Sequence, residues 1–311
     1  MHGGNQTSVT EFILLGLSDR PEQQSILFTS FLIVYLVALL GNLVIMMVIA
    51  LSPQLHNPMY LFISALNIVD IGLISDTLPK MLTNIYTNMK AISYKDCISQ
   101  LYFFVFFAAA ECVLLAVMAY DRYIAICFPL RYQVIMRTHI CLLMVTSTFV
   151  VSFFNALLHT LLMASLSFCG PNQILHYFCD IGPLLKLSCV RTSTNELMIF
   201  TEGSLIVMIP FSAVLLSYMC IVVAILKIRS SEGRRRAFST CSSHLTVVTL
   251  FYGTLVFMYF RPSSSYSLGE ERFVTVMYNV LAPTLNPFIY SLRNNEVKNA
   301  FRRLISRKNV M

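Results

Sequence analysis

Three ionisable side chains lie in or beside one long apolar run, where a charge is costly. The run extends from Leu101 to Ala119, holds Glu111 as its only formal charge and is followed by Asp121 and Arg122. At about 100° per residue of α-helix, Arg122 lies about 20° off the face that carries Glu111. Charges near an apolar phase usually mark a functional element, so this stripe predicts one. The alternative is a helix end whose long charged side chains only reach out to water.

A second acid, Asp70, lies near the middle of the preceding apolar run. If the two runs are antiparallel helices, Asp70 and Glu111 lie at similar depth and either share a proton or hold a cation. Asn42 and Asn286, in the first and last runs, could complete a set of oxygen ligands for which Na⁺ is the candidate ion. The alternative is that one or both carboxyls are protonated and only hydrogen-bonded. We expect no other cofactor.

The last apolar run contains two prolines four residues apart, the second of which is Pro287. Prolines remove backbone donors and kink a helix. Such a kink would move Tyr290 toward or away from Arg122. In the preceding run, His244 is within reach of Arg122 and Tyr218, either as part of a switch or as an interior residue whose hydrogen bonds are satisfied.

The composition indicates that these runs are membrane-spanning helices. Of 311 residues, 57% are hydrophobic and only 12% are charged, with a mean hydropathy of +0.71, whereas about a quarter of a soluble domain is charged. Apolar runs of about 20 residues predict helices rather than the shorter strands of a barrel. The net charge of +7 does not indicate nucleic acid, because the basic residues lie beside the apolar runs. The polar residues 1–25 do not resemble a cleavable signal peptide.

We therefore predict an all-α membrane protein, a seven-transmembrane helix bundle with a short amphipathic helix after span seven. Residues 1–25 form an extracellular N-terminal tail, residues 26–292 the bundle, and residues 293–311 a cytoplasmic amphipathic helix and tail. The predicted spans are 26–51, 58–81, 99–121, 139–163, 197–226, 238–260 and 272–292.

Charge, glycosylation and cysteine positions agree on the orientation. An outer N-terminus leaves most of the 22 Lys and Arg residues inside, as membrane proteins prefer. Asn5, in Asn5-Gln6-Thr7, is then a lumenal glycosylation acceptor. Four cysteines fall in outer loops, where disulfides persist, and could pair in three ways. They are Cys97, Cys169, Cys179 and Cys189.

Several of these residues together resemble the rhodopsin-like G-protein-coupled receptors. The set comprises Gly41-Asn42, Asp70, Asp121-Arg122-Tyr123, Pro210 with Tyr218, and Asn286-Pro287 with Tyr290. Longer motifs resemble the odorant receptors within that class. These motifs are Pro58-Met59-Tyr60-Leu61-Phe62, Met118-Ala119-Tyr120-Asp121-Arg122-Tyr123, Ser242-Ser243-His244-Leu245, Phe251-Tyr252-Gly253 and the stretch from Pro287 to Asn294.

The sequence also departs from other rhodopsin-like receptors. Tyr252 stands where most of them carry a tryptophan, as in odorant receptors. Residues 273–292 contain no lysine to bind retinal. Amine receptors carry an aspartate at the position of Phe104, so its absence argues against a protonated amine as the main ligand.

The resemblance implies a receptor in the plasma membrane, with an extracellular N-terminus that is short and unstructured. Its ligand would be a small, mostly apolar, volatile molecule, and its partner a stimulatory, olfactory-type G protein that raises cyclic AMP. The implied disulfides are Cys97–Cys179 and Cys169–Cys189. In the resting state Arg122 would pair with Asp121.

The resemblance also implies two sets of site residues. The ligand-binding residues would be Phe104, Val105, Ala108, Ala109, Cys112, Ile199, Glu202, Gly203, Ile206, Tyr252, Leu255, Tyr259, Val276 and Asn279. The coupling and switch residues would be Asp121, Arg122, Tyr123, Tyr218, His244, Asn286, Pro287 and Tyr290. Glu202 either faces the ligand or is neutral and bonded to a neighbour such as His159.

Two rival functions remain at this point. A transporter or channel would have an internal repeat or glycine-broken spans along a path. The sequence has no internal repeat, and the kinked span lies at the inner end. A receptor of the same fold could bind a non-volatile lipid or metabolite. An enzyme is not expected, because the sequence has no metal-ligand cluster, nucleophile–base pair or phosphate-binding loop.

Overall fold

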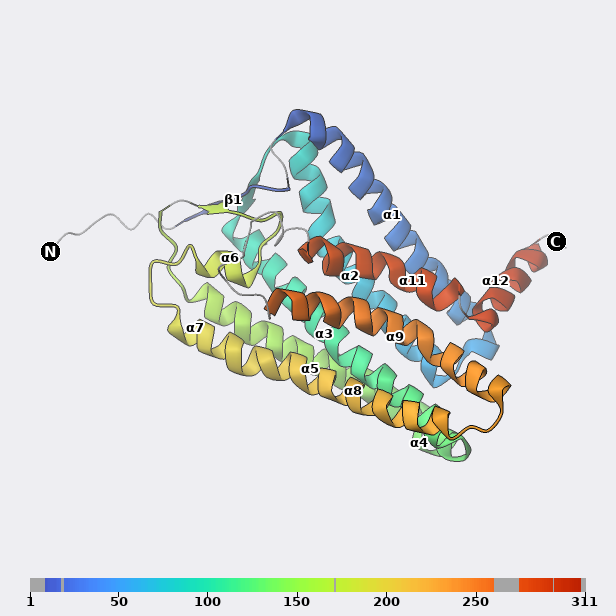
Figure 1. Ribbon diagram of the computed structural model, residues 1–311. Coiled ribbons are helices and arrows are strands. Elements are labelled where there is room, and N and C mark those ends of the chain that lie inside the picture. The colour runs from blue at the N-terminus through green and yellow to red at the C-terminus, as the bar shows by residue number, and fades with distance from the viewer. Residues whose placement is uncertain (1–8, 18–19, 171, 260–273, 293, 309–311) are drawn as a thin grey trace.

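The computed structural model describes residues 9–17, 20–170, 172–259, 274–292 and 294–308, and most of them lie in a bundle of long helices (Figure 1). Seven long helical segments make up the bundle in this described part. They are α1 (Pro21–Leu51), α2 (Pro58–Thr87), α3 (Tyr94–Cys127), α5 (Thr138–Ala164), α7–η3–α8 (Ser193–Met198, Ile199–Gly203 and Ser204–Leu226), α9 (Ser231–Tyr259) and η5–α11 (Met277–Leu281 and Ala282–Leu292).

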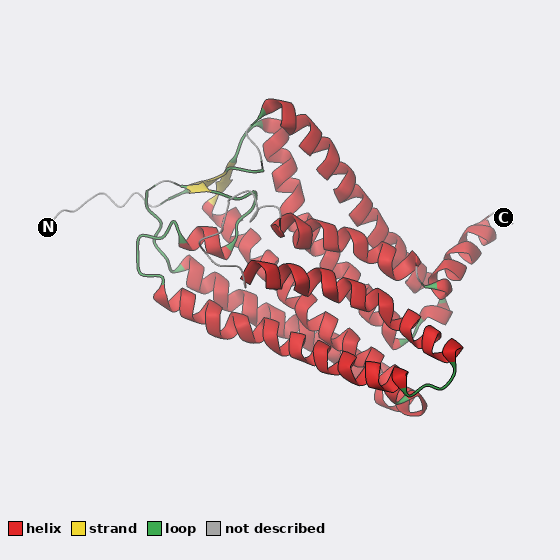
Figure 2. Cartoon of the chain, viewed as in Figure 1, coloured by secondary structure: helices red, strands yellow, loops and turns green. Residues whose placement is uncertain are grey.

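Shorter elements connect or follow these helices. They are η1 (Pro53–Leu55), η2 (Pro129–Arg131), α4 (Tyr132–Ile135), α6 (Ile181–Leu185), α12 (Asn295–Lys308) and the strands β1 (Glu11–Leu14), β2 (Ala91–Ser93) and β3 (Gln173–Ile174). The strands lie at one end of the bundle and α12 at the other (Figures 1 and 2). We call these the sheet end and the α12 end.

The seven-helix prediction is confirmed. Within the described residues, α1, α2, α3, α5 and α7–η3–α8 are each long and apolar enough to cross a bilayer, and α9 and η5–α11 pack beside them as the sixth and seventh helices. The helices are longer than the predicted spans: α2 continues to Thr87, and α3 begins at Tyr94. Hydropathy detects only the apolar part of a helix, whereas the backbone hydrogen bonds continue through its polar ends.

Large apolar side chains cover the outside of the bundle. Ile33, Leu40 and Met47 on α1 and Leu216 and Met219 on α8 are all exposed. In a soluble protein so much exposed apolar surface would be a liability, but in a bilayer it faces lipid. α3 instead packs against α2, α5 and α8 and lies deep in the bundle (Figure 1).

Gly41 allows α1 to approach α11 closely. A Cβ atom at this position would lie 3.1 Å from Cγ of Pro287 and 3.5 Å from its Cβ. A glycine at this point therefore brings the helix that carries Asn42 against the proline of the last helix.

The N-terminal segment forms a strand at the centre of a small sheet. β1 pairs antiparallel with β2, through Phe12 and Ile92, and parallel with β3, through Leu14 and Ile174. Phe12 and Leu14 are both 0% exposed, and the Phe12 ring meets the Phe168 ring edge-on. The expectation of an unstructured tail over residues 1–25 is therefore wrong from Glu11 onward, and α1 already begins at Pro21. The apolar side chains of alternate strand residues are buried against the bundle, and loops distant in sequence satisfy the backbone.

Candidate functional site

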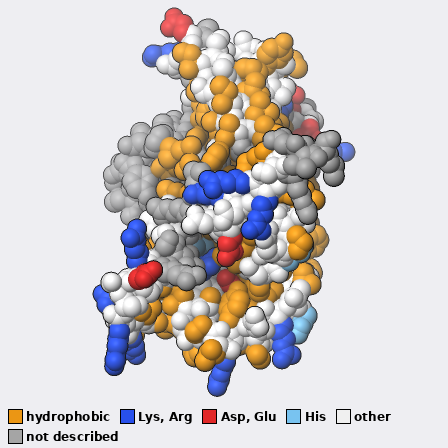
Figure 3. Space-filling model, turned by 90° about the vertical axis from the view of Figure 1, so that its right-hand side faces the viewer, with side chains coloured by type: hydrophobic (Ala, Val, Ile, Leu, Met, Phe, Trp, Pro, Cys, Tyr) orange, Lys and Arg blue, Asp and Glu red, His pale blue; other side chains and the backbone are white. Residues whose placement is uncertain are grey.

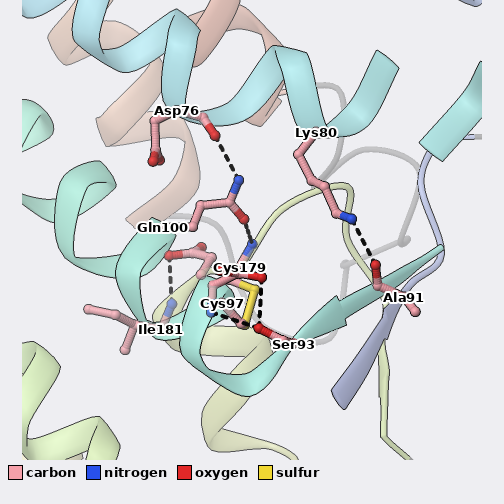
Figure 4. Close-up of a disulfide and its surroundings, with 10 residues drawn as sticks. Asp76, Lys80, Ala91, Ser93, Cys97, Gln100, Cys179 and Ile181 are labelled. Carbon is pink, nitrogen blue, oxygen red and sulfur yellow. Dashed lines mark hydrogen bonds between the residues drawn. A yellow bond between two sulfur atoms is a disulfide. The ribbon is translucent and has the colours of Figure 1, made fainter. Parts of the chain in front are cut away.

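At the sheet end, a disulfide joins the start of α3 to the long loop between α5 and α7. Cys97 and Cys179 form this disulfide, as predicted (Figure 4). Cys169 and Cys189 form a second disulfide within the loop. Asn5 lies outside the described residues. The loop is thus held over the end of the helices by α3 and by strand β3.

Gln100 connects this loop to the second helix. Its Nε2 donates to the backbone carbonyl of Asp76 at 2.7 Å, and its Oε1 accepts from the backbone N–H of Cys179 at 2.9 Å (Figure 4). The side chain is buried. Both ends of one amide are satisfied, so α2, α3 and the loop are fixed relative to one another.

The residues Tyr177 and Phe178 of the loop reach into the bundle. The Phe178 ring lies 4.8 Å from that of Phe104, which in turn lies 6.3 Å from that of Tyr278 in η5. Burial raises the pKa of Tyr177, whose hydroxyl is buried near Asn279 of η5 without a hydrogen-bond partner. The loop therefore supplies aromatic groups beside predicted ligand residues of α3 and η5, and the sequence reasoning missed both of them.

The predicted ligand-binding residues lie on four helical segments. Phe104, Val105, Ala109, Cys112, Tyr252 and Asn279 are buried, and Ala108, Ile199, Glu202, Gly203, Ile206, Leu255 and Val276 are partly buried. Tyr252 joins α9 to α3, because its hydroxyl donates to the carbonyl of Cys112 at 3.3 Å. The side chain of Tyr259 lies outside the described residues.

Glu202 points toward α5. Its Oε2 lies 2.7 Å from Nε2 of His159. With its amide nitrogen oriented toward Glu202, Asn155 also donates to both carboxylate oxygens, at 2.6 and 2.9 Å. The bond to His159 was one of the two alternatives for Glu202, whereas Asn155 was not foreseen. The sequence could have indicated Asn155 as a partner of Glu202, because Asn155 lies four residues before His159 on the same helical face.

In the middle of the bundle, Asp70 and Glu111 are both 0% exposed. Nδ2 of Asn286 donates to both carboxylate oxygens of Asp70, at 3.0 and 3.1 Å. Asn42 donates to the carbonyls of Ala38 and Pro283, which places it beside α11. The structure thus brings Asp70 and Asn286 together across α2 and α11, as expected.

Several oxygens in this region lack a donor. Both carboxylate oxygens of Glu111 and the Oδ1 atoms of Asn42 and Asn286 are buried without a hydrogen-bond partner. Unsatisfied buried acceptors are costly and suit a hard cation, which prefers oxygen ligands. In the part of the chain that the structure describes, no group of three or more His, Cys, Asp or Glu is placed to hold a metal. The residues fit Na⁺ only as a mixed site of carboxylates and amides.

At the α12 end, His244 ties three helices together. It is 0% exposed, its Nδ1 lies 2.7 Å from the hydroxyl of Tyr218 on α8, and its Nε2 lies 3.1 Å from the carbonyl of Leu115 on α3. A carbonyl can only accept, so Nε2 carries a proton, and in the neutral ring Nδ1 accepts from Tyr218. The predicted proximity of His244 to Tyr218 is realised.

Arg122 is only 7% exposed. The expected ion pair between Arg122 and Asp121 is not formed. Asp121 instead accepts a hydrogen bond of 2.7 Å from the hydroxyl of Tyr132 in α4. No nitrogen of Arg122 lies within 4.0 Å of that carboxylate among the described atoms. Burial, followed by the negative charge of Asp121, raises the pKa of Tyr132. The tyrosine hydroxyl therefore stays neutral and donates to the acid.

The hydroxyls of Tyr218 and Tyr290 lie within electrostatic range of the Arg122 guanidinium. The Tyr290 hydroxyl is buried without a hydrogen-bond partner. Tyr123 is partly buried and Pro287 is buried. Figure 3 shows this end with blue Lys and Arg side chains spread over it. The exposed ones include Arg131, Arg137, Lys227, Arg229, Arg234, Arg235, Arg302 and Arg303.

The start of α12 is fixed by a polar cluster that sequence reasoning missed. The hydroxyl of Tyr60 donates to Glu296 at 2.8 Å and accepts from Nδ2 of Asn294 at 2.8 Å. Oδ1 of Asn294 accepts from the backbone N–H groups of Glu296 and Val297, so Asn294 caps the helix. Tyr60 belongs to the motif Pro58–Phe62, which was the available signal.

Seven packed helices, a buried arginine near the end of the third and a basic face beside it are the features of a G-protein-coupled receptor of the rhodopsin-like class. The family model described as "Olfactory receptor" matches residues 31–308. The chain therefore belongs to the olfactory receptor family, which is a family of receptors and not of enzymes.

Curated relatives agree over nearly the whole chain. "Olfactory receptor 1f45" of Rattus norvegicus is 51% identical over 98% of this chain and 98% of its own length. "Olfactory receptor 1M1" of Homo sapiens is 49% identical over 99% and 98%, and "Olfactory receptor 1G1" of Gorilla gorilla gorilla is 52% identical over 98% and 97%. The family and the apolar helices make this chain a multi-pass plasma membrane protein.

Proposed function

We propose that this receptor binds a small, mostly apolar, volatile molecule in the half of the bundle nearer the sheet end. The predicted ligand residues lie there on α3, η3–α8, α9 and η5 and are mostly apolar, with amide and hydroxyl groups among them. Small-ligand sites generally have this composition. Because such a ligand has few atoms, we expect micromolar affinity.

The sheet end would face the outside and the α12 end the cytosol. The distribution of Lys and Arg supports this orientation, because exposed basic side chains gather around α4, the α8–α9 connection and α12 (Figure 3). The two disulfides at the opposite end support it independently, since disulfides persist in oxidising compartments.

The observation that carries the proposed mechanism is the bridge from Leu115 through His244 to Tyr218. It joins α3, α8 and α9 near Arg122 with two hydrogen bonds. A ligand shifts a receptor only by binding one arrangement better than another. Ligand contacts on the same three helices would favour an arrangement in which this bridge opens. Arg122, Tyr218 and Tyr290 would then meet a stimulatory G protein, and cyclic AMP would rise.

The test is the Arg122→Ala variant in cells that express a cyclic AMP reporter. We expect no ligand-evoked cyclic AMP, because the buried guanidinium is the group that the open bundle would present. Arg137→Ala, which removes an exposed arginine at the same end, is the matched control and should respond normally. Surface labelling must show equal amounts of all three proteins. A normal response from the Arg122→Ala variant would refute the mechanism.

The same screen separates the rival functions. A response to non-volatile lipids or metabolites, and to no volatile compound, would favour a receptor of the same fold for those ligands. A ligand-dependent flux in cells that lack the G protein would favour a transporter or channel.

We also propose that Na⁺ binds among Asp70, Glu111, Asn42 and Asn286. The buried acceptor oxygens that lack donors support this proposal. The ion would supply positive charge between two acids that otherwise repel each other at the centre of the bundle.

A further inference from the structure

Asp76 is a carboxylate in a membrane-spanning helix to which neither the switch nor the predicted ligand set assigns a role. It lies within α2, well away from both helix ends, and is half-buried. Its Oδ2 atom is buried and has no hydrogen-bond partner. An ionisable side chain inside a membrane span is rare, costly and usually functional.

The backbone of Asp76 is held firmly while its side chain is left free. Pro79, three residues later, interrupts the hydrogen bonds of α2, and the Asp76 carbonyl accepts from Gln100 at 2.7 Å. The carboxylate turns away from Gln100 (Figure 4). Gln100 in turn holds the loop at Cys179. The residue is therefore positioned by α3 and the loop, while its carboxyl group bonds to neither.

The nearest cation along the helix does not pair with this carboxyl group. Lys80, one turn further along α2, extends toward β2 and donates to the carbonyl of Ala91 at 2.8 Å (Figure 4). No ion pair involves Asp76 among the described residues. Phe104, one turn beyond Gln100 on α3, packs on Phe178 and is a predicted ligand residue. Because Gln100 bonds to the Asp76 backbone, Asp76 lies about one helical turn from Phe104 along the bundle, near the apolar side chains expected to hold a ligand.

We propose that Asp76 binds the protonated nitrogen of a small apolar amine. This inference rests on the proposed function and names a ligand class for the same site. It replaces the sequence-based argument that the absence of an acid at Phe104 disfavours amines, because α2 supplies the acid instead. A charged donor on a half-buried carboxylate makes a stronger hydrogen bond than a neutral one.

The experiment compares straight-chain amines with aldehydes of the same length, for example hexylamine with hexanal and octylamine with octanal, in the cyclic AMP assay. We expect Asp76→Asn to raise the half-maximal concentration of the amines by about tenfold or more, the usual effect of losing a hydrogen bond to a charged group. The aldehydes should be unaffected. Asp76→Glu should keep the amine response. Glu11→Gln, which removes an exposed acid at the sheet end, is the charge-matched control.

Three outcomes would overturn the inference. In the first, wild type and Asp76→Asn respond equally to amines. In the second, the wild-type receptor answers aldehydes or other volatiles but no amine. In the third, Asp76→Ala weakens the response to aldehydes, and Asp76→Asn leaves the response to amines unchanged. The Asp76 side chain would then act only as a neutral hydrogen-bond donor. Silence toward every compound at normal surface level would instead count against the proposed function and remove the inference with it.

Discussion

At the scale of single residues, the bundle satisfies its polar groups very unequally. His244 and Gln100 each use two side-chain atoms to join separate elements. Asp121 obtains its donor from Tyr132. By contrast, both oxygens of Glu111 and one oxygen of Asp76 have no donor. Buried polar groups are normally paired, so the unpaired ones are the places at which an ion or a ligand is expected.

The proposed Na⁺ site among these unpaired oxygens can be tested by thermal melting. We expect purified receptor to melt at a higher temperature in sodium chloride than in choline chloride at equal ionic strength. Binding to the folded state alone adds about 1.4 kcal/mol at ten times the dissociation constant. Glu111→Gln and Asp70→Asn should each abolish the difference, and Asp96→Asn, which removes an acid from the first turn of α3, should retain it. Equal melting in both salts for the wild-type receptor would contradict the proposal.

At the scale of elements, backbone proximity matters as much as side-chain packing. α1 meets α11 where Gly41 faces Pro287, and Asn42 donates to the carbonyl of Pro283 from the next position. The contact between the first and last helices of the bundle therefore includes a small residue, a proline ring and one amide. It leaves little room for a larger side chain.

The prediction at this scale is that Gly41→Ala destabilises the receptor. Its new methyl group would lie 3.1 Å from Cγ of Pro287, whose ring cannot turn away. Overpacking of this kind costs about 1–3 kcal/mol, which exceeds the gain from the better helix propensity of alanine. The matched control is Gly253→Ala in α9, where a Cβ atom meets nothing within 4 Å. Thermal melting in detergent measures both, and a Gly41→Ala variant as stable as Gly253→Ala would disprove the packing argument.

At the scale of the whole molecule, the two ends of the bundle are held differently. The sheet end is closed by a three-stranded sheet, two disulfides and the Phe12–Phe168 contact. Near the α12 end, α9 is joined to α3 and α8 by the hydrogen bonds of His244. This contrast favours movement at the α12 end, as the proposed mechanism requires.

The sheet provides the prediction at this scale. Phe12→Ala removes a ring that is 0% exposed and packs on Phe168 and Tyr94. Losing a buried phenylalanine typically costs about 3–5 kcal/mol. We expect the N-terminal segment of the variant to be cleaved by added protease and its surface level to fall. Glu11→Ala, on the exposed face of the same strand, should behave as wild type. Equal protease resistance of the two variants would mean that β1 does not hold this end closed.

Much of this architecture could be predicted, because the bilayer itself sets the length of an apolar span. The seven helices and the depth of Asp70 and Glu111 followed from that rule. The two disulfides were implied by the resemblance instead, and the ligand set from the same source stays a prediction. What failed depends on contacts between distant residues. The pairing of Ile13 with Gln173, and the choice of Tyr132 rather than Arg122 as the partner of Asp121, have no local signal. Asp76 was overlooked because a single acid does not change the apolar average of its span.

The strand order has a consequence for biosynthesis. β1 leaves the ribosome first, but its parallel neighbour β3 lies about 160 residues later in the chain. At ordinary rates of translation the first strand waits roughly 10 to 30 s for that partner. Four helices must be inserted before the gap is filled, so a nascent chain that stalls earlier leaves Phe12 and Leu14 without this partner strand. With the sheet end outside, as proposed, these apolar side chains would face the lumen, where chaperones could bind them and retain the unfinished receptor before export.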